Sequence, residues 1–174
     1  LDYLLVDLPP GTGNEAISII ELIGKVDGSV IVTTPQEVVL LDVRKAVLFS
    51  KDSNVPVIGI VENMSGLICP HCSKNIDVFK TGGGARICRE LGVDFLGKIP
   101  LDPGITEKCD DGRAFVDASP DSDASKAFNE IVEKCELFVK TQKEVFDEVT
   151  VYREVPFLGK VPVDPDFLND RTSR

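Results

Sequence analysis

The sequence predicts an α/β protein with a mostly parallel sheet and helices on both faces of that sheet. Short apolar runs rich in β-branched residues alternate along the chain with longer stretches of helical period. Such runs are typical of parallel strands, because crossover helices cover both faces of a parallel sheet. The chain has 174 residues, of which 43% are hydrophobic and 28% charged, as in an ordinary globular protein.

Four apolar runs predict strands. They are Leu1–Leu8, Ser29–Thr33, Val55–Val61 and the weaker Asp94–Ile99. The first run is expected to be a buried parallel strand that ends at a Pro-Pro-Gly break. Ligands of parallel α/β sheets bind beyond the carboxyl ends of the strands. We therefore expect chemistry in the loops that follow the first, third and fourth strands.

Four stretches between and after these runs predict helices. Glu15–Ile23 has an amphipathic pattern and is followed by Gly24, a typical helix end. A second helix is expected from Pro35 to about Ser50, because valines recur there at helical spacing. Ala85–Leu91 predicts a short helix, and Ser122–Lys143 a long amphipathic one.

Charge and cysteine content exclude several classes of protein. The chain has 19 basic and 29 acidic residues, a net charge of −10 with the single histidine neutral. Such a field repels phosphate backbones and anionic lipid surfaces, so we expect neither a nucleic-acid nor a membrane partner. Five irregularly spaced cysteines do not form the framework of a secreted disulfide protein, which favours the cytoplasm.

The ends of the chain suggest a portion of a longer protein. The first residue is Leu1 rather than methionine, and it begins inside the expected sheet. We expect a domain portion over residues 1–141 and an accessory tail over residues 142–174. The tail contains FLGKVPVDPD at Phe157–Asp166, which matches FLGKIPLDPG at Phe95–Gly104 in seven of ten positions. No role is assigned to this repeat.

The loop after the first expected strand has the pattern of a nucleotide-sensing loop. Asp7 ends the run and a Gly-containing turn follows, up to Gly13. A carboxylate in that place can hold Mg²⁺ through water, while the turn approaches the γ-phosphate. An aspartate that merely caps a strand–helix turn gives the same pattern.

Two further loops lie at the expected ligand edge. Asn63 follows the third strand, and its amide offers both a donor and an acceptor to a nucleobase. A turn residue that binds its own backbone is the alternative. Pro100–Pro103 follows the fourth strand and also reads as a simple proline-directed turn.

A close cysteine pair predicts a metal-binding loop. Cys69 and Cys72 frame Cys-Pro-His-Cys, a spacing that lets two thiolates bind one centre. Zinc or an iron–sulfur cluster normally needs four ligands, which a twofold dimer would supply. A redox dithiol and a half zinc site completed elsewhere are the alternatives. The remaining cysteines, Cys88, Cys109 and Cys135, fall in helical patterns and are expected to be inert.

Gly82–Arg86 does not have the features of a phosphate loop. No Lys-Ser/Thr pair follows the glycines, so we expect a flexible turn that leads into a helix, with Arg86 able to touch a phosphate or a partner. A serine–histidine–aspartate set is not credible, because the only histidine lies in the cysteine loop.

Taken together, these strings resemble the Mrp-type iron–sulfur cluster carrier ATPases, within the MinD and nitrogenase-iron-protein group of P-loop NTPases. DYLLVDLPPGTGNE, VIVTTPQEV, GIVENMSGLICPHC and GGGARICRELGVDFLGKIPLDPGI occur in the order and spacing of that family. The resemblance runs from about Leu1 to Lys140. It implies a P-loop NTPase fold and a cytoplasmic homodimer that binds ATP and delivers clusters to apoproteins.

The resemblance also implies roles for individual residues. Asp7 matches the catalytic loop that senses Mg²⁺ and the γ-phosphate, and Gly11 and Thr12 belong to its turn. On the adenine side the matching residues are Asn63, Pro100, Leu101 and Asp102. The metal ligands would be Cys69 and Cys72, which hold a 4Fe–4S cluster between two subunits, with zinc possible in its place.

The chain departs from the family pattern in one respect. These 174 residues contain no Walker A loop, so the phosphate cradle and its lysines are missing. We therefore expect ATP hydrolysis from a parent protein but not from this chain alone. The alternative functions are a MinD/ParA-like partitioning or scaffold ATPase with structural zinc at the cysteine pair, and a non-catalytic binding module.

Overall fold

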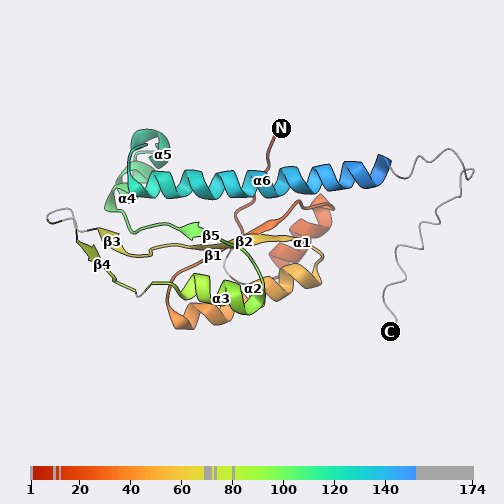
Figure 1. Cartoon of the computed structure of the whole chain (residues 1–174), viewed down its shortest axis with the longest axis horizontal. Coiled ribbons are helices and arrows are strands. Elements are labelled where there is room, and N and C mark those ends of the chain that lie inside the picture. The colour runs from red at the N-terminus through yellow and green to blue at the C-terminus, as the bar shows by residue number, and fades with distance from the viewer. Residues whose placement is uncertain are drawn as a thin grey trace, which may run out of the picture. The chain divides into compact units, whose positions relative to one another are not determined.

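The computed structural model describes residues 2–9, 11, 13–68, 72, 74–79 and 81–151 (Figure 1). Its contacts divide the chain into two compact units, Leu1–Val139 and Lys140–Arg174. The described part of the second unit is the carboxyl-terminal stretch of helix α6. The second copy of the repeated segment, Phe157–Asp166, lies outside the described residues, as does the tail beyond Val151.

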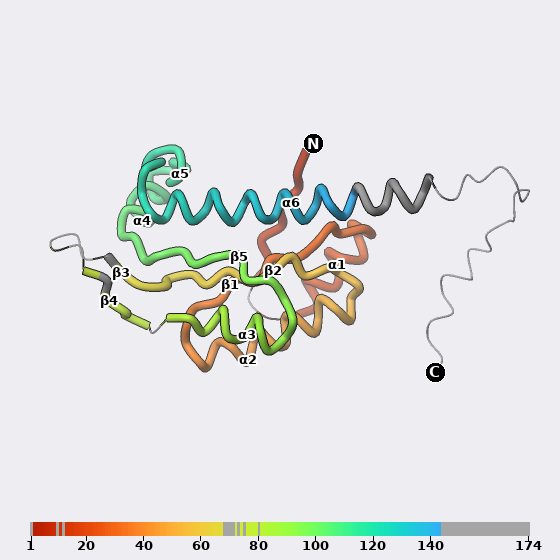
Figure 2. The backbone as a smooth tube through the Cα atoms, in the orientation of Figure 1, coloured from red at the N-terminus to blue at the C-terminus, as the bar shows by residue number. Residues whose placement is uncertain are grey.

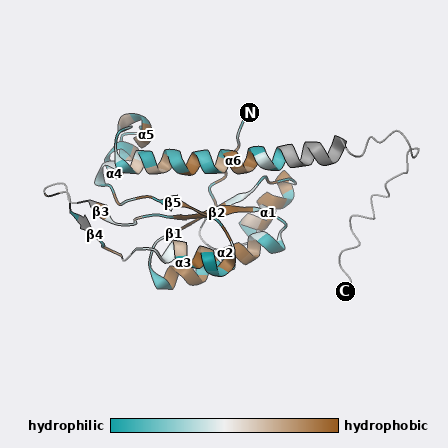
Figure 3. Cartoon of the chain, in the orientation of Figure 1, coloured by the Kyte–Doolittle hydropathy of each residue, from teal (hydrophilic) through white to brown (hydrophobic). Residues whose placement is uncertain are grey.

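A three-stranded parallel sheet forms the centre of the first unit. It consists of β1 (Ser29–Thr33), β2 (Val57–Glu62) and β5 (Phe95–Lys98), in the order β1-β2-β5. Both pairings are parallel, and β2 is buried along nearly its whole length. Figure 3 shows hydrophobic residues along these strands, the composition that a sheet covered on both faces requires. The expected parallel sheet is confirmed, with β1 and β5 at its edges.

Two helices cover one face of this sheet. They are α2 (Glu37–Asp52) and α3 (Gly83–Leu91), which Figure 1 shows side by side below the strands. Of the three valines whose helical spacing predicts α2, Val43 and Val47 are buried in the core, whereas Val39 is half-buried. The buried cluster on this face comprises Leu40, Val43, Val47, Ile60, Ile87 and Cys88.

The opposite face packs against α6 (Asp123–Val151), with α4 (Pro103–Asp110) and α5 (Phe115–Ala118) beside it. Its buried cluster comprises Ile58, Val61, Leu96, Ile99, Phe115, Ala124 and Ile131. Helices therefore lie on both faces, as expected. The sequence analysis missed α4 and α5, because they are short and their apolar pattern is weak.

A small antiparallel hairpin leaves the sheet after β2. Its strands are β3 (Leu67–Ile68) and β4 (Asn75–Ile76), and they flank the cysteine loop. Figure 2 shows the hairpin extending from the end of the sheet that lies opposite α1. Strands of two residues have no readable period, which is why the sequence did not predict them.

The expected strand Leu1–Leu8 is wrong for this structure. Residues 2–8 form no strand, and Leu4 and Leu5 are 64% and 92% exposed. The run has the composition of a buried strand, but no described strand pairs with it and its large apolar side chains are exposed. Composition sets how well a segment suits a strand, whereas a neighbouring strand and a covering layer decide whether the strand forms. The helix that follows, α1 (Asn14–Ile23), matches its prediction and ends at Gly24, whose φ is 78°.

The three glycines before α3 each have a geometric reason. Gly82 has φ 83°, a left-handed conformation that costs glycine little. A Cβ on Gly83 would lie 2.7 Å from the Pro35 carbonyl oxygen, and one on Gly84 would lie 3.1 Å from Glu62. The expected turn into a helix is confirmed. The helix begins at Gly83, within the glycine run and two residues before the predicted start at Ala85.

We predict that Gly83→Ala destabilises the protein. Alanine favours a helix over glycine by about 1 kcal/mol, so propensity alone would stabilise α3. The clash of the new Cβ with the Pro35 backbone outweighs this gain. We expect it to lower the free energy of unfolding by about 1–3 kcal/mol, since backbone must move. Thermal unfolding followed by circular dichroism would measure this as a midpoint lowered by several degrees.

The control is Gly92→Ala, at the carboxyl end of α3. Gly92 has φ 63° and open space around the Cβ position, so it tests backbone strain without a steric clash. An unfolding midpoint of Gly83→Ala equal to or above that of the parent chain would contradict the packing argument.

Candidate functional site

The loops after β2 and β5 lie side by side at the carboxyl edge of the sheet. Parallel pairing continues past the ends of both strands, which brings Asn63 close to the Pro100–Asp102 turn. Three backbone hydrogen bonds join the loops: Ile99 N–H to the Glu62 carbonyl (2.9 Å), Ser65 N–H to the Ile99 carbonyl (3.0 Å) and Leu101 N–H to the Gly66 carbonyl (2.8 Å).

Asn63 is fixed by its own backbone and by β1. Its N–H donates to the Thr33 carbonyl at 2.7 Å, and its side-chain Oδ1 accepts from Met64 N–H at 2.9 Å. Met64 has φ 55°, a left-handed turn that this side-chain bond supports. The side chain is half-buried, and no described residue hydrogen-bonds to its amide nitrogen. A donor is therefore available at the edge of the sheet.

The Pro100–Asp102 turn leads directly into α4. Asp102 is the N-cap of that helix: its carboxylate accepts from Gly104 N–H at 2.8 Å, and Pro103 occupies the first turn. Leu101 forms a parallel bridge with Leu67, the first residue of β3. The turn therefore touches the hairpin that carries the cysteine loop.

The cysteine loop lies between β3 and β4. Cys72 is exposed in a turn, whereas Cys69 and His71 lie outside the described residues. Within the described part of the chain, no three His, Cys, Asp or Glu side chains are grouped as a metal site requires. By sequence, the Cys69/Cys72 pair offers two of the four ligands that a tetrahedral zinc or a cluster normally needs.

The nucleotide-sensing loop is not assembled with these elements. Asp7 is exposed in a segment without regular structure, and no described residue hydrogen-bonds to it. Gly11 has φ 104°, consistent with the expected tight turn, and Thr12 lies outside the described residues. Because residues 2–8 form no strand, Asp7 does not end a strand of the described sheet. The expectation that it ends a buried strand is therefore wrong.

One residue in this region, Glu62, was not singled out from the sequence. It is fully buried at the end of β2, and its carboxylate accepts from Gly82 N–H (3.1 Å), Gly84 N–H (2.6 Å) and the Ser65 hydroxyl. Backbone donors at a helix start suit an anion, because the helix dipole is positive there. The two glycine donors lie about twenty residues further on, so no local pattern reveals them.

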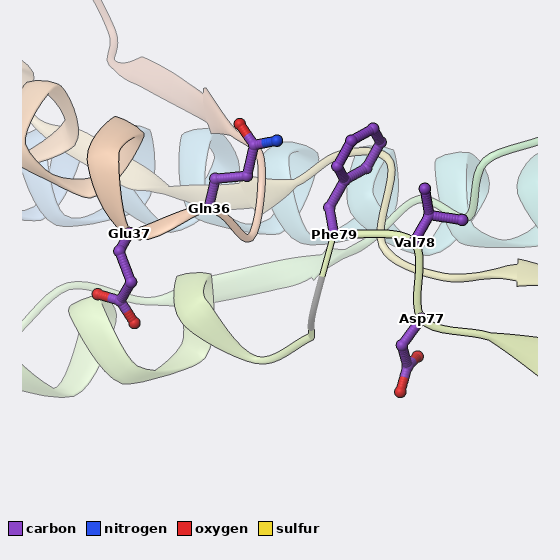
Figure 4. A pocket seen from close by; sticks show the side chains of 5 residues that line it. All are labelled: Gln36, Glu37, Asp77, Val78 and Phe79. Carbon is purple, nitrogen blue, oxygen red and sulfur yellow. The ribbon is translucent and has the colours of Figure 1, made fainter.

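An open groove of about 350 Å³ lies between the start of α2 and the segment that follows β4. Figure 4 shows Gln36 and Glu37 on one side, with Asp77, Val78 and Phe79 on the other. None of the predicted site residues lines this groove.

Arg86 does not serve as a free phosphate contact in this structure. Its guanidinium binds both carboxylate oxygens of Glu37, at 2.7 and 2.6 Å, which ties α3 to α2. That hydrogen bonding, with the charge of Glu37, raises the pKa of Arg86. The exposed pair adds little stability, because solvent screens it.

The three cysteines outside the loop are in helices, as expected. Cys88 is buried in α3, Cys109 is exposed in α4 and Cys135 is half-buried in α6. Burial raises the pKa of Cys88 to about 11, with the negative charge of Asp94 adding to the effect, and burial also raises that of Cys135. Neutral, enclosed thiols of this kind are poor metal ligands.

Comparison with known proteins gives a consistent picture. A family model described as ParA, NUBPL iron-transfer P-loop NTPase, matches residues 1–136. The chain is 53% identical over 137 residues to the cytosolic Fe-S cluster assembly factor NBP35 of Kluyveromyces lactis, which covers 76% of this chain and 42% of that protein. It is 50% identical over 144 residues to the iron-sulfur cluster carrier protein of Methanocaldococcus jannaschii, with coverages of 83% and 49%.

A solved structure supports the same fold. The nucleotide-binding protein from Archaeoglobus fulgidus, in complex with ADP, matches with a TM-score of 0.59 and 38% identity, over 66% of this chain and 47% of that one. The chain spans about half the length of the curated relatives it matches. None of the helices in the described residues is long and apolar enough to cross a membrane.

We predict that Cys88 resists alkylation at pH 8 while Cys72 reacts. With a pKa of about 11, roughly one Cys88 thiol in a thousand is ionised at that pH, and the group is also enclosed. Iodoacetamide labelling followed by peptide mass spectrometry is expected to modify Cys72 and Cys109 first. Equal labelling rates for Cys88 and Cys72 would contradict the structure.

The raised pKa of Cys88 also sets a pH dependence of stability. The folded state favours the neutral thiol, so this contribution is fully present below the pKa of the unfolded chain, near 9. It is lost as the pH rises towards 11. Cys88→Ala is therefore expected to flatten the fall in unfolding free energy between pH 9 and pH 11, as measured by urea titration.

Proposed function

The chain belongs to the NUBPL-type iron-transfer P-loop NTPase family, and from this membership we propose that it is part of an ATP-dependent carrier of iron–sulfur clusters. The observation that carries the proposal is the connection between two predicted sites. The cysteine hairpin begins at Leu67, which bridges to Leu101 in the turn predicted to lie near adenine. A carrier whose cargo release responds to nucleotide needs such a connection.

The cluster would be held between two copies of the chain. Each copy supplies Cys69 and Cys72, and a twofold axis through the hairpins would bring four thiolates to one 4Fe–4S cluster. The exposed position of Cys72 supports this arrangement, because a ligand shared between subunits must be accessible before they associate. The cargo would pass to recipient apoproteins in the cytoplasm, in keeping with the cytosolic relative.

These residues would supply only part of a nucleotide site. The free amide nitrogen of Asn63 and the Pro100–Asp102 turn suit the adenine end, since a ring nitrogen accepts a hydrogen bond. Asp7, with Gly11 and Thr12 in its turn, would hold Mg²⁺ and sense the γ-phosphate. The phosphate end of the nucleotide site is incomplete in these residues, because the 174 residues contain no Walker A loop. The chain alone is therefore proposed not to hydrolyse ATP.

We predict that anaerobic reconstitution with iron and sulfide loads about one four-iron cluster per two chains. Cys69→Ser is expected to abolish loading, because serine does not replace a thiolate on iron. Cys109→Ser is the matched control: it removes an exposed cysteine on α4 and is expected to leave the iron content unchanged. Iron and sulfide analysis, with the visible absorbance of the cluster, measures the outcome.

Two outcomes of that experiment contradict the proposal. Full iron content in Cys69→Ser would remove the cysteine pair from cluster binding. Zinc without a visible chromophore, in protein purified without oxygen, would favour a scaffold with structural zinc instead.

We predict that Asp7→Asn lowers ATP hydrolysis by at least about tenfold while nucleotide binding changes less. The substitution removes the carboxylate proposed to hold Mg²⁺, which matters most when charge develops on the phosphate. The assay needs a polypeptide that joins this chain to a Walker A loop, and the 174-residue chain alone is the negative control. Unchanged turnover would exclude Asp7 from the catalytic loop.

A further inference from the structure

Glu62 joins the two ends of the segment that carries the cysteine pair. That segment follows β2, begins after Ser65 and ends at Gly82, the N-cap of α3. One carboxylate oxygen, Oε1, accepts from both ends: from the Ser65 hydroxyl and, at 3.1 Å, from Gly82 N–H. The other oxygen, Oε2, accepts from Gly84 N–H at 2.6 Å.

The surroundings of this carboxylate show that it is built into the fold. Glu62 has no exposed surface, although burying a carboxylate is unfavourable unless its oxygens are hydrogen-bonded. Gly84 makes the approach possible, because a Cβ there would lie 3.1 Å from Glu62 and 3.2 Å from Phe95. A glutamine has one acceptor oxygen where glutamate has two, so either Gly82 N–H or the buried Gly84 N–H would lose its acceptor.

The same residue is also part of the loop proposed to face adenine. The Glu62 carbonyl accepts from Ile99 N–H at 2.9 Å, and the next residue along the chain is Asn63. The backbone of Glu62 therefore joins the loop of Asn63, whereas its side chain binds the two ends of the cysteine segment.

We propose that Glu62 is a positioning residue, which holds both ends of the cysteine hairpin together and ties them to the loop that carries Asn63. The effect of Glu62 on cluster binding rests on the proposed function, in which the cysteine pair holds the cluster. The mechanism is preorganisation: a hairpin with fixed ends loses less conformational entropy when two thiolates must meet a second pair. Glu62 does not touch the cluster or the nucleotide in this arrangement.

The test is Glu62→Gln, which keeps the shape but replaces one acceptor oxygen by an amide donor. The first measurement is backbone hydrogen exchange in the metal-free chain. We expect amides of residues 66–81 to exchange about tenfold faster or more, while those in the middle of α2 change little. The matched control is Glu90→Gln, which removes an exposed carboxylate on α3 that binds Arg44 of α2 and is expected to leave residues 66–81 unchanged.

The second measurement is a titration with Co²⁺ alone, followed through its thiolate charge-transfer absorbance. Glu62→Gln is expected to weaken Co²⁺ binding by about tenfold, and Glu90→Gln to leave it unchanged. If the parent chain shows no such absorbance, the proposed function fails at the cysteine pair, and hydrogen exchange still decides the role of Glu62. Faster exchange throughout the chain, with no excess at residues 66–81, would overturn the positioning role in favour of general stabilisation.

Ser65 provides an independent variant in case Glu62→Gln does not fold. Ser65→Ala removes one hydroxyl donor, and Ser65→Thr retains it. We expect faster exchange of residues 66–81 in the alanine variant and recovery in the threonine variant. Identical exchange in the two variants would contradict the positioning role of Glu62, because only the threonine variant keeps the hydroxyl that donates to it.

Discussion

The candidate site depends on the parallel pairing of β2 with β5, which continues past the ends of both strands. Within the strands this pairing is ordinary sheet structure between buried residues. Beyond them the same ladder supports two loops that have no other regular structure, through the hydrogen bonds of Ser65 and Leu101. Backbone groups that would otherwise need water are thereby satisfied at the edge of the sheet. The positions of Asn63 and of the Pro100–Asp102 turn follow from that ladder.

The elements whose signals are local were predictable from the sequence. The stripe of Val43 and Val47 identifies α2, and the β-branched run Ser29–Thr33 identifies β1, because each pattern directly encodes which side chains are buried. Leu1–Leu8 has an equally strong pattern, yet its described residues form no strand. A pattern reports that residues suit a buried strand, but the neighbours and covering layers that make one are long-range properties.

The site was predictable in its residue types but not in its connections. The cysteine pair and the Asn63 loop stand out in the sequence, since their spacing is short. Glu62 does not, because the donors from Gly82 and Gly84 are brought to it by the fold. Asp102 is a further example: the sequence indicates a turn, and the structure uses the carboxylate as a helix cap. Residues whose partners are backbone groups far along the chain leave no trace in local sequence patterns.

The hairpin shows how a small element can be both anchored and accessible. A two-stranded hairpin is at best marginally stable in water, and strands of two residues are shorter than most. Its stability must therefore come from its ends, where Leu67 bridges to Leu101 and Glu62 holds Gly82. Anchoring at the ends is compatible with the exposed position of Cys72 between the two strands. In the proposed carrier, two such loops would meet at a shared cluster, and a fixed base with an accessible cysteine suits that arrangement.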